Sequence, residues 1–84
     1  MYYDHFDYQR VYDALMGSVR ADQSRVMLKF ADDEGYMEAK RQLFDENMIN
    51  DAAQYLMKTY GAAHWDYTYQ TDDAFRLITI YWKE

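Results

Sequence analysis

The chain has 84 residues, with no cysteine and no proline, and its 15 acidic and 9 basic side chains give a net charge of −6. This length predicts a single domain over residues 1–84 with a small core, and the lack of cysteine excludes disulfides and thiolate metal sites. The negative charge argues against direct binding to nucleic acid or to membranes, because both attract Lys and Arg. Since no apolar run is long enough to cross a bilayer, we expect a cytoplasmic protein, in the host cytoplasm if the gene belongs to a phage.

The first predicted element is a helix over residues 4–20. Its apolar side chains recur at spacings of three and four and therefore share one face. These side chains are Tyr8, Val11, Tyr12, Leu15 and Val19. Asp4 is suited to cap the N-terminus, and Asp7 suits the first turn. Gly17 weakens the C-terminal end, so the chain is expected to turn over residues 21–24.

A strand is predicted next, over residues 25–31. Val26, Leu28 and Phe30 fall on one face, and the other face is mainly basic. This alternation is typical of a half-buried strand.

Residues 33–60 have a helical periodicity with one change of phase. Asp32 or Asp33 can cap the start of this stretch. The apolar positions of its first part are Tyr36, Met37, Leu43 and Phe44. Its second part ends near Gly61, where a left-handed residue can terminate a helix. The pattern fits two helices or one long bent helix, and a break near Asn47 is favoured because the apolar face changes there.

The last part of the chain is predicted as a β-hairpin. Trp65, Tyr67 and Tyr69 alternate with polar residues, residues 70–73 have turn chemistry, and residues 75–82 alternate again. The predicted fold is therefore α+β, in the order α-β-α-(α)-β-β. It contains a three-stranded, mainly antiparallel sheet with two or three helices on one face.

Both faces of the last predicted strand are apolar. Phe75, Leu77 and Tyr81 share one face and form a candidate core set, while Ile78, Ile80 and Trp82 share the other. A strand covered on one side only should be polar on the other, so we expect the second face to contact another protein chain. The predicted aromatic interface comprises Trp65, Tyr67, Tyr69, Ile78, Ile80 and Trp82.

Acidic side chains are concentrated on the predicted helices. The predicted acidic face comprises Asp32, Asp33, Glu34, Glu38, Asp45, Glu46 and Asp51. Helical carboxylates can imitate the phosphate spacing of duplex DNA, and in charge and size alone the chain resembles small phage and plasmid inhibitors of DNA-binding enzymes. The alternative is an ordinary solvated helix surface.

The sequence contains no motif for catalysis or for cofactor binding. His5 with Asp4 and Asp7, and His64 with Asp66, are acidic–histidine groups, but neither supplies the three or four ligands of a metal site. Glycine-rich phosphate loops and nucleophile elbows are also missing. We therefore predict no enzyme activity, no cofactor and no metal.

These observations favour a non-enzymatic protein-interaction module. Its most concrete version is an inhibitor of the phage or mobile-element type, in the anti-CRISPR or anti-restriction class. Such an inhibitor would bind a nucleic-acid-handling protein through the acidic helices and the aromatic sheet face. A homodimeric structural or regulatory domain with its sheet face buried against its twin is one alternative. A small enzyme without a recognisable motif is another.

Overall fold

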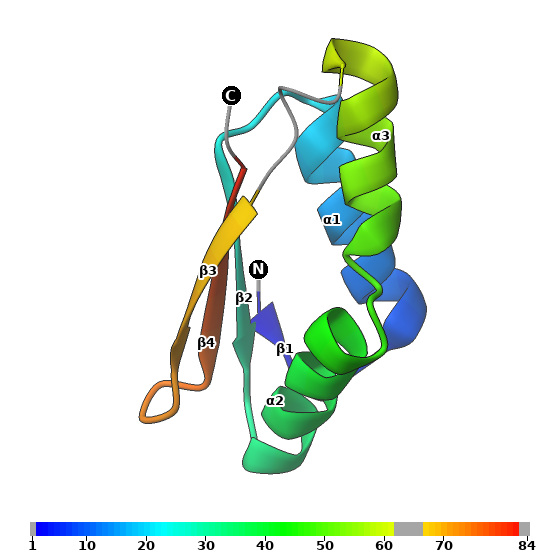
Figure 1. Cartoon of the computed structure of the whole chain (residues 1–84). Helices are drawn as coiled ribbons and strands as arrows, with labels where there is room; N and C mark the ends of the chain where they lie inside the picture. Colours follow the sequence, from blue (N-terminus) through cyan, green and yellow to red (C-terminus); the bar gives the residue numbers. More distant parts are fainter. Residues whose placement is uncertain (1, 62–66, 83–84) are drawn as a thin grey trace.

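The computed structural model describes residues 2–61 and 67–82 of the chain. Within these residues, a sheet of four strands forms one layer, and three α-helices lie together on one side of it (Figure 1). The elements are β1 (Tyr2–Tyr3), α1 (Tyr8–Arg20), β2 (Arg25–Phe30), α2 (Asp33–Lys40), the π-helical segment η1 (Arg41–Asp45), α3 (Asn50–Tyr60), β3 (Tyr67–Asp72) and β4 (Leu77–Trp82). The α+β class and the helices on one face agree with the sequence-based prediction.

The sheet is mixed and has the strand order β1-β2-β4-β3. β4 pairs antiparallel with both β2 and β3, whereas β1 pairs parallel with β2. The prediction of a three-stranded, mainly antiparallel sheet is therefore wrong in its strand count and in its omission of a parallel pair. A strand of two residues shows no alternation in the sequence. β1 is held by its pairing with β2 and by the stacking of Tyr3 on Phe30, whose ring centroids are 5.4 Å apart.

α1 begins four residues later than predicted, at Tyr8. Asp7 rather than Asp4 is its N-cap, and the Asp7 carboxylate accepts a hydrogen bond from the Arg10 backbone N–H at 3.3 Å. Because β1 occupies residues 2–3 of the sheet layer, the following residues must first cross to the helix layer. The helix then continues past Gly17 to Arg20.

α2 and α3 are separate helices, in agreement with the break near Asn47 that the change of apolar face predicts. Asp32 caps α2 by accepting a hydrogen bond from the Gly35 N–H at 2.8 Å. After α2 the chain widens into η1, where the Glu46 N–H donates to the Arg41 carbonyl five residues earlier. Asn47 then takes a positive φ of 62° and separates the two helices, and Gly61 ends α3 at a φ of 86°.

The β3–β4 turn occupies residues 73–76 instead of the predicted 70–73. The Asp72 carboxylate accepts hydrogen bonds from the backbone N–H groups of Ala74 and Phe75, at 3.1 and 3.2 Å. This side-chain turn closes the hairpin three residues later than the polar composition suggests. Arg76 completes the turn with a φ of 53°.

The core lies between the helices and the inner face of the sheet. β2 contributes Val26, Leu28 and Phe30, as predicted, and β4 contributes Ile78, Ile80 and Trp82. The buried helix residues that pack against them are Val11, Leu15, Val19, Tyr36, Ala39, Leu43, Ile49, Ala52 and Leu56. The Trp82 indole N–H donates to the Ser18 hydroxyl on α1 at 2.8 Å, so the one polar atom of this buried ring has a partner.

Candidate functional site

The predicted aromatic interface is divided by the fold. Ile78 and Ile80 are fully buried and Trp82 is 8% exposed, so the expectation that these three residues form an exposed face is wrong. Both faces of β4 are apolar, and the helices cover the face that carries this set. Of the remaining members, Tyr67 is half-buried and Tyr69 is 49% exposed. Trp65 lies outside the described residues.

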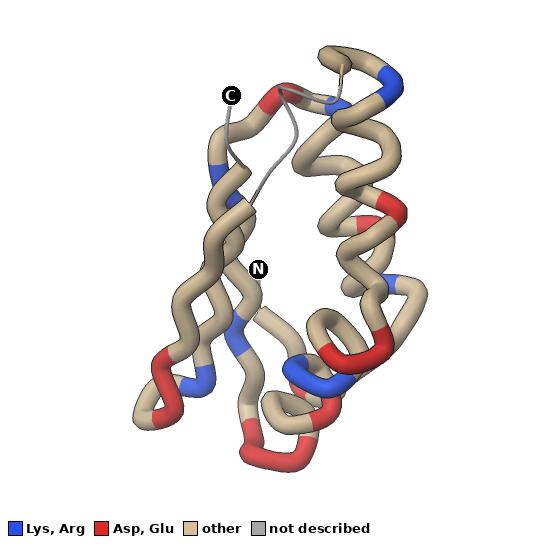
Figure 2. The backbone as a smooth tube through the Cα atoms, in the orientation of Figure 1, with Lys and Arg blue, Asp and Glu red and all other residues tan. Residues whose placement is uncertain are grey.

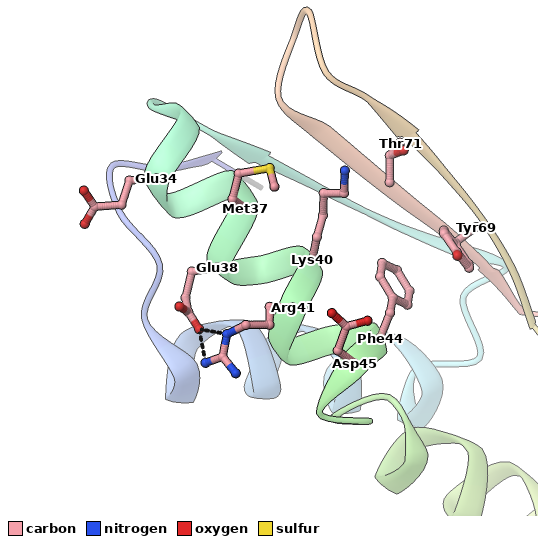
Figure 3. Close-up of a pocket in the computed structure, with 9 residues that line it drawn as sticks. All are labelled: Glu34, Met37, Glu38, Lys40, Arg41, Phe44, Asp45, Tyr69 and Thr71. Atoms are coloured by element: carbon pink, nitrogen blue, oxygen red, sulfur yellow. Dashed lines mark hydrogen bonds and ion pairs between the residues drawn. The ribbon is translucent and has the colours of Figure 1, made fainter.

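An open groove with a volume of about 720 Å³ lies between α2–η1 and β3. Its lining combines apolar and charged side chains from the helical segment with two residues of the strand (Figure 3). The lining residues are Glu34, Met37, Glu38, Lys40, Arg41, Phe44, Asp45, Tyr69 and Thr71. The groove therefore brings three predicted acidic residues and one predicted aromatic residue to one place.

The apolar part of the groove is built around a stacked ring pair. The rings of Phe44 and Tyr69 lie with centroids 4.0 Å apart and planes inclined by 21°. Met37, which is 56% exposed, lines the same groove. Offset stacking of this kind stabilises the pair beyond area burial, so the two rings hold each other in place while Tyr69 remains accessible.

Both cations of the groove are engaged by neighbouring carboxylates. Arg41 lies 2.5 Å from Glu38 and 2.7 Å from Glu46, and Lys40 lies 3.5 Å from Asp73. The hydrogen bonds from Arg41 and then from Gln42 hold the pKa of the Glu38 carboxyl below its usual range. These pairs orient the two cationic side chains.

Glu34 and Asp45 add to the negative charge of the groove. Both are exposed, and no ion pair joins either carboxylate to another side chain in the part of the chain that the structure describes. Five carboxylates and two cations lie in or beside the groove, when Glu46 and Asp73 are included. The electrostatic field of the groove is therefore negative and favours a cationic ligand.

The other predicted acidic residues have separate positions. Asp32 caps α2, and Asp33 lies 3.8 Å from the Arg76 guanidinium in the β3–β4 turn. Asp51 is in the first turn of α3, where its hydrogen bond with Tyr12 raises the pKa of that phenol. Figure 2 shows acidic positions of α2, η1 and the β3–β4 turn at one end of the molecule, the lower end in that view.

The buried phenol of Tyr36 connects α2 to the β3–β4 turn. Its hydroxyl donates to the Asp73 carboxylate. Burial, followed by this hydrogen bond, raises the pKa of Tyr36 to about 12. The same hydrogen bond from Tyr36, followed by the charge of Lys40, lowers the pKa of Asp73. The shifted pKa values thus belong to contacts that fasten the hairpin to α2.

In residues 2–61 and 67–82, no three His, Cys, Asp or Glu side chains are grouped closely enough to hold a metal ion. The predicted pair of His64 and Asp66 lies outside these residues. None of the described helices is both long and apolar enough to span a bilayer.

Sequence reasoning missed the groove although it identified several of its residues. Met37 and Phe44 are seven positions apart, and the sequence predicts them on one apolar helix face. They do share a face, but this face lines the groove and is not fully buried. Phe44 and Tyr69 lie 25 positions apart, and no local spacing links them. The signal that could have found the site is the combination of bulky apolar residues with acidic neighbours on one side of a helix.

Comparison of the chain with protein-family models, with characterised proteins and with solved structures finds no match.

Proposed function

We propose that this protein is a non-enzymatic interaction module that binds another protein through the groove between α2–η1 and β3. The observation that carries the proposal is the Phe44–Tyr69 ring pair, with Tyr69 exposed, in a groove that also contains two carboxylates without ion-pair partners among the described residues. Aromatic residues and Met are enriched at the centres of protein interfaces, and charged residues around them set the choice of partner.

The partner surface is expected to be basic. A net charge of −6 and the negative groove attract a cationic protein and speed its encounter with this surface. Interactions of this kind weaken as salt increases, because the Debye length falls to about 8 Å at physiological ionic strength and about 3 Å at 1 M.

The most concrete version of this function is inhibition of a nucleic-acid-handling protein, in the anti-CRISPR or anti-restriction class. In this version the acidic end of the molecule, with Asp32, Asp33 and Glu34 at the start of α2, occupies the basic groove in which the target holds nucleic acid. The support is the acidic net charge, the small size and the acidic backbone positions at the end of the molecule where α2 begins (Figure 2).

A pair of charge-reversal variants tests the proposal. Wild-type protein is used to capture partners from its native host, and each captured protein is then titrated with Glu34→Lys/Asp45→Lys and with the control Asp4→Lys/Asp13→Lys. Both variants change the net charge equally, but only the first changes the groove. Loss of binding with the first variant alone is expected. Equal binding of the two variants would contradict the proposal.

A second candidate function is a homodimer that buries the outer face of the sheet. The observation that favours it is the apolar content of this face and of the adjoining turn, since Tyr2, Met27 and Phe75 are all exposed while the helices lie on the opposite side (Figure 1). Sedimentation at micromolar concentration tests it. A dimer that Met27→Lys dissociates supports this function, and a monomer contradicts it.

A further inference from the structure

β3 forms one edge of the sheet, and the direction of its backbone groups follows from the register. The Phe30 N–H donates to the Arg76 carbonyl, and the Trp82 N–H donates to the Ser24 carbonyl. In an antiparallel pair, hydrogen-bonded and non-bonded positions alternate, so the even-numbered residues of β4 are bonded to β2. The odd-numbered residues of β4 therefore bond to β3.

The partners of these odd-numbered residues are Thr68, Gln70 and Asp72. Consequently the backbone N–H and C=O groups of Tyr69 and Thr71, which alternate with these partners, point away from the sheet at its free edge. The side chains of Tyr69 and Thr71 lie on the inner face, opposite Ile80 and Ile78, and line the groove. Tyr69 and Thr71 therefore belong both to the free edge and to the lining of the groove.

Apart from one charged residue, Asp72, β3 contains no side chain of the kinds that usually prevent strand pairing. Natural edge strands are blocked by Lys, by Pro or by a bulge, whereas β3 has the sequence YTYQTD and pairs with β4 in an unbroken register over all six residues. Thr and Tyr favour extended backbone. β3 is therefore a template to which a further strand can add.

The charges of the groove select the occupant. A strand added to β3 would project every second side chain onto the inner face, beside Phe44 and Asp45 (Figure 3). Basic and aromatic side chains suit these positions. A second copy of the chain pairing through its own β3 would bring no Lys or Arg to them, because this strand contains Asp72 as its one charged residue. Charge complementarity thus favours a basic segment of a different protein.

We propose that the β3 edge and the groove together bind an extended basic segment of a partner protein by strand addition. This inference rests on the proposed protein-binding function and adds to it the mode of binding and the chemistry of the ligand. Main-chain hydrogen bonds to Tyr69 and Thr71 hold the segment, and its inward side chains contact the ring pair and Asp45.

A synthetic peptide provides the first test. The probe is acetyl-Thr-Arg-Thr-Tyr-Thr-Arg-Thr-amide, whose Arg and Tyr side chains share one face when it is extended. On titration, the amide hydrogen exchange of Tyr69 and Thr71 is expected to slow by about tenfold or more, while that of Gln70, which is already bonded to β4, changes little. Binding without slower exchange at Tyr69 and Thr71 would overturn strand addition. No binding at millimolar peptide would also overturn it.

Backbone methylation of the peptide provides the second test. Two peptides carry N-methyl groups on alternate residues, one on the Arg and Tyr residues and the other on the Thr residues. Since only one alternate set of N–H groups faces β3 in an added strand, one methylated peptide should lose binding and the other should keep it. Loss with both peptides, or with neither, would overturn the proposal. The peptide with Glu in place of Arg should bind about tenfold more weakly or not at all, and equal binding would overturn the charge argument.

A matched pair of protein variants separates this inference from the proposed function. Thr71→Pro removes an N–H at the free edge and leaves the β3–β4 ladder intact, because the ladder bonds run through Gln70 and Asp72. Thr71→Ala controls for the lost hydroxyl, which is hydrogen-bonded to Tyr36. The Thr71→Pro protein should bind the peptide about tenfold more weakly than the Thr71→Ala protein. Equal affinities would overturn strand addition.

The natural partner distinguishes the remaining cases. A partner that needs Glu34 and Asp45 but binds Thr71→Pro as well as wild type leaves the proposed function standing and overturns strand addition. The hydrogen exchange of the Tyr69 and Thr71 amides is also measured without peptide at several protein concentrations. Exchange that slows as protein concentration rises would show that a second copy occupies the edge. This result would also overturn the proposal that a basic segment of a partner binds there.

Discussion

The two faces of β4 have similar side chains and different environments. On the inner face Ile78 and Ile80 are fully buried, whereas on the outer face Leu77 and Tyr81 are half-buried. Thr79, on the outer face, is also buried, because it lies on a central strand between its neighbours on β2 and β3. Apolar character therefore does not decide which face becomes the core. The side on which the helices pack decides it.

The largest effect is expected at Trp82. Trp82→Ala should lower the free energy of unfolding by about 3–5 kcal/mol, because it leaves a cavity in the core and removes the partner of the Ser18 hydroxyl. The control is Tyr81→Ala, one position away on the outer face, which should cost less than about 1 kcal/mol. Urea denaturation measures both values. Equal losses would contradict the assignment of the two faces.

A smaller effect is expected where the helix layer is fastened to the hairpin. Tyr36→Phe should lower the free energy of unfolding by about 1–2 kcal/mol, because it removes a buried hydrogen bond to the Asp73 carboxylate. The pKa of Tyr36 is raised to about 12, chiefly by burial, and an unfolded tyrosine titrates near pH 10. The folded state thus holds this proton more tightly than the unfolded state.

The sign of the pH dependence follows from this difference. The stabilisation by Tyr36 is fully present below pH 10 and is lost as the pH rises toward about 12. Wild type should therefore lose more stability than Tyr36→Phe between these values, as measured by urea denaturation at a series of alkaline pH values. Parallel curves for the two proteins would rule out the contribution of this phenol.

Gly17 and Gly35 allow the same comparison of an exposed and a buried position to be made in the helices. A Cβ at Gly17, on the exposed side of α1, would meet no atom within 4 Å, whereas a Cβ at buried Gly35 would lie 3.1 Å from the Asp32 carboxylate and 3.2 Å from the Phe6 backbone nitrogen. Gly17→Ala should raise the free energy of unfolding by about 0.5–1 kcal/mol through helix propensity. Gly35→Ala should lower it, since backbone must move. Thermal unfolding of both variants measures the two signs, and a stabilising Gly35→Ala would show that this contact relaxes freely.

The smallest effect is expected at Phe75. This ring is 64% exposed in the β3–β4 turn, 5.5 Å from the Lys29 amine, which donates its hydrogen bond to the Phe75 backbone carbonyl rather than to the side chain. Phe75→Ser should change the free energy of unfolding by less than about 0.5 kcal/mol. A loss as large as that of Trp82→Ala in the same urea experiment would mean that the outer face is covered in solution.

Local patterns predicted much of the fold. The alternation in β2 identified Val26, Leu28 and Phe30 as its buried face. Asp32 or Asp33 was predicted as the cap of α2, and Asp32 is the residue that caps it. The change of apolar phase favoured the break at Asn47, where the positive φ separates α2 from α3. Each of these features is determined within a few residues, so the sequence alone contains the information.

Features that depend on distant residues were missed or misplaced. β1 exists because two residues pair with β2, and the position of the hairpin turn depends on how the Asp72 carboxylate folds back on the chain. The groove requires Phe44 and Tyr69 to meet across two layers. These contacts have no local signature.

The sequence by itself determined the α+β class, most helix boundaries, the acidic charge and the concentration of aromatic rings near the end of the chain. Periodicity and capping are local properties, and charge is a sum over residues. The tertiary structure alone decided which apolar face of β4 is covered, which rings stay accessible and which carboxylates keep no ion-pair partner. Each of these outcomes depends on the side of the sheet on which the helices pack and on residues far apart in the chain.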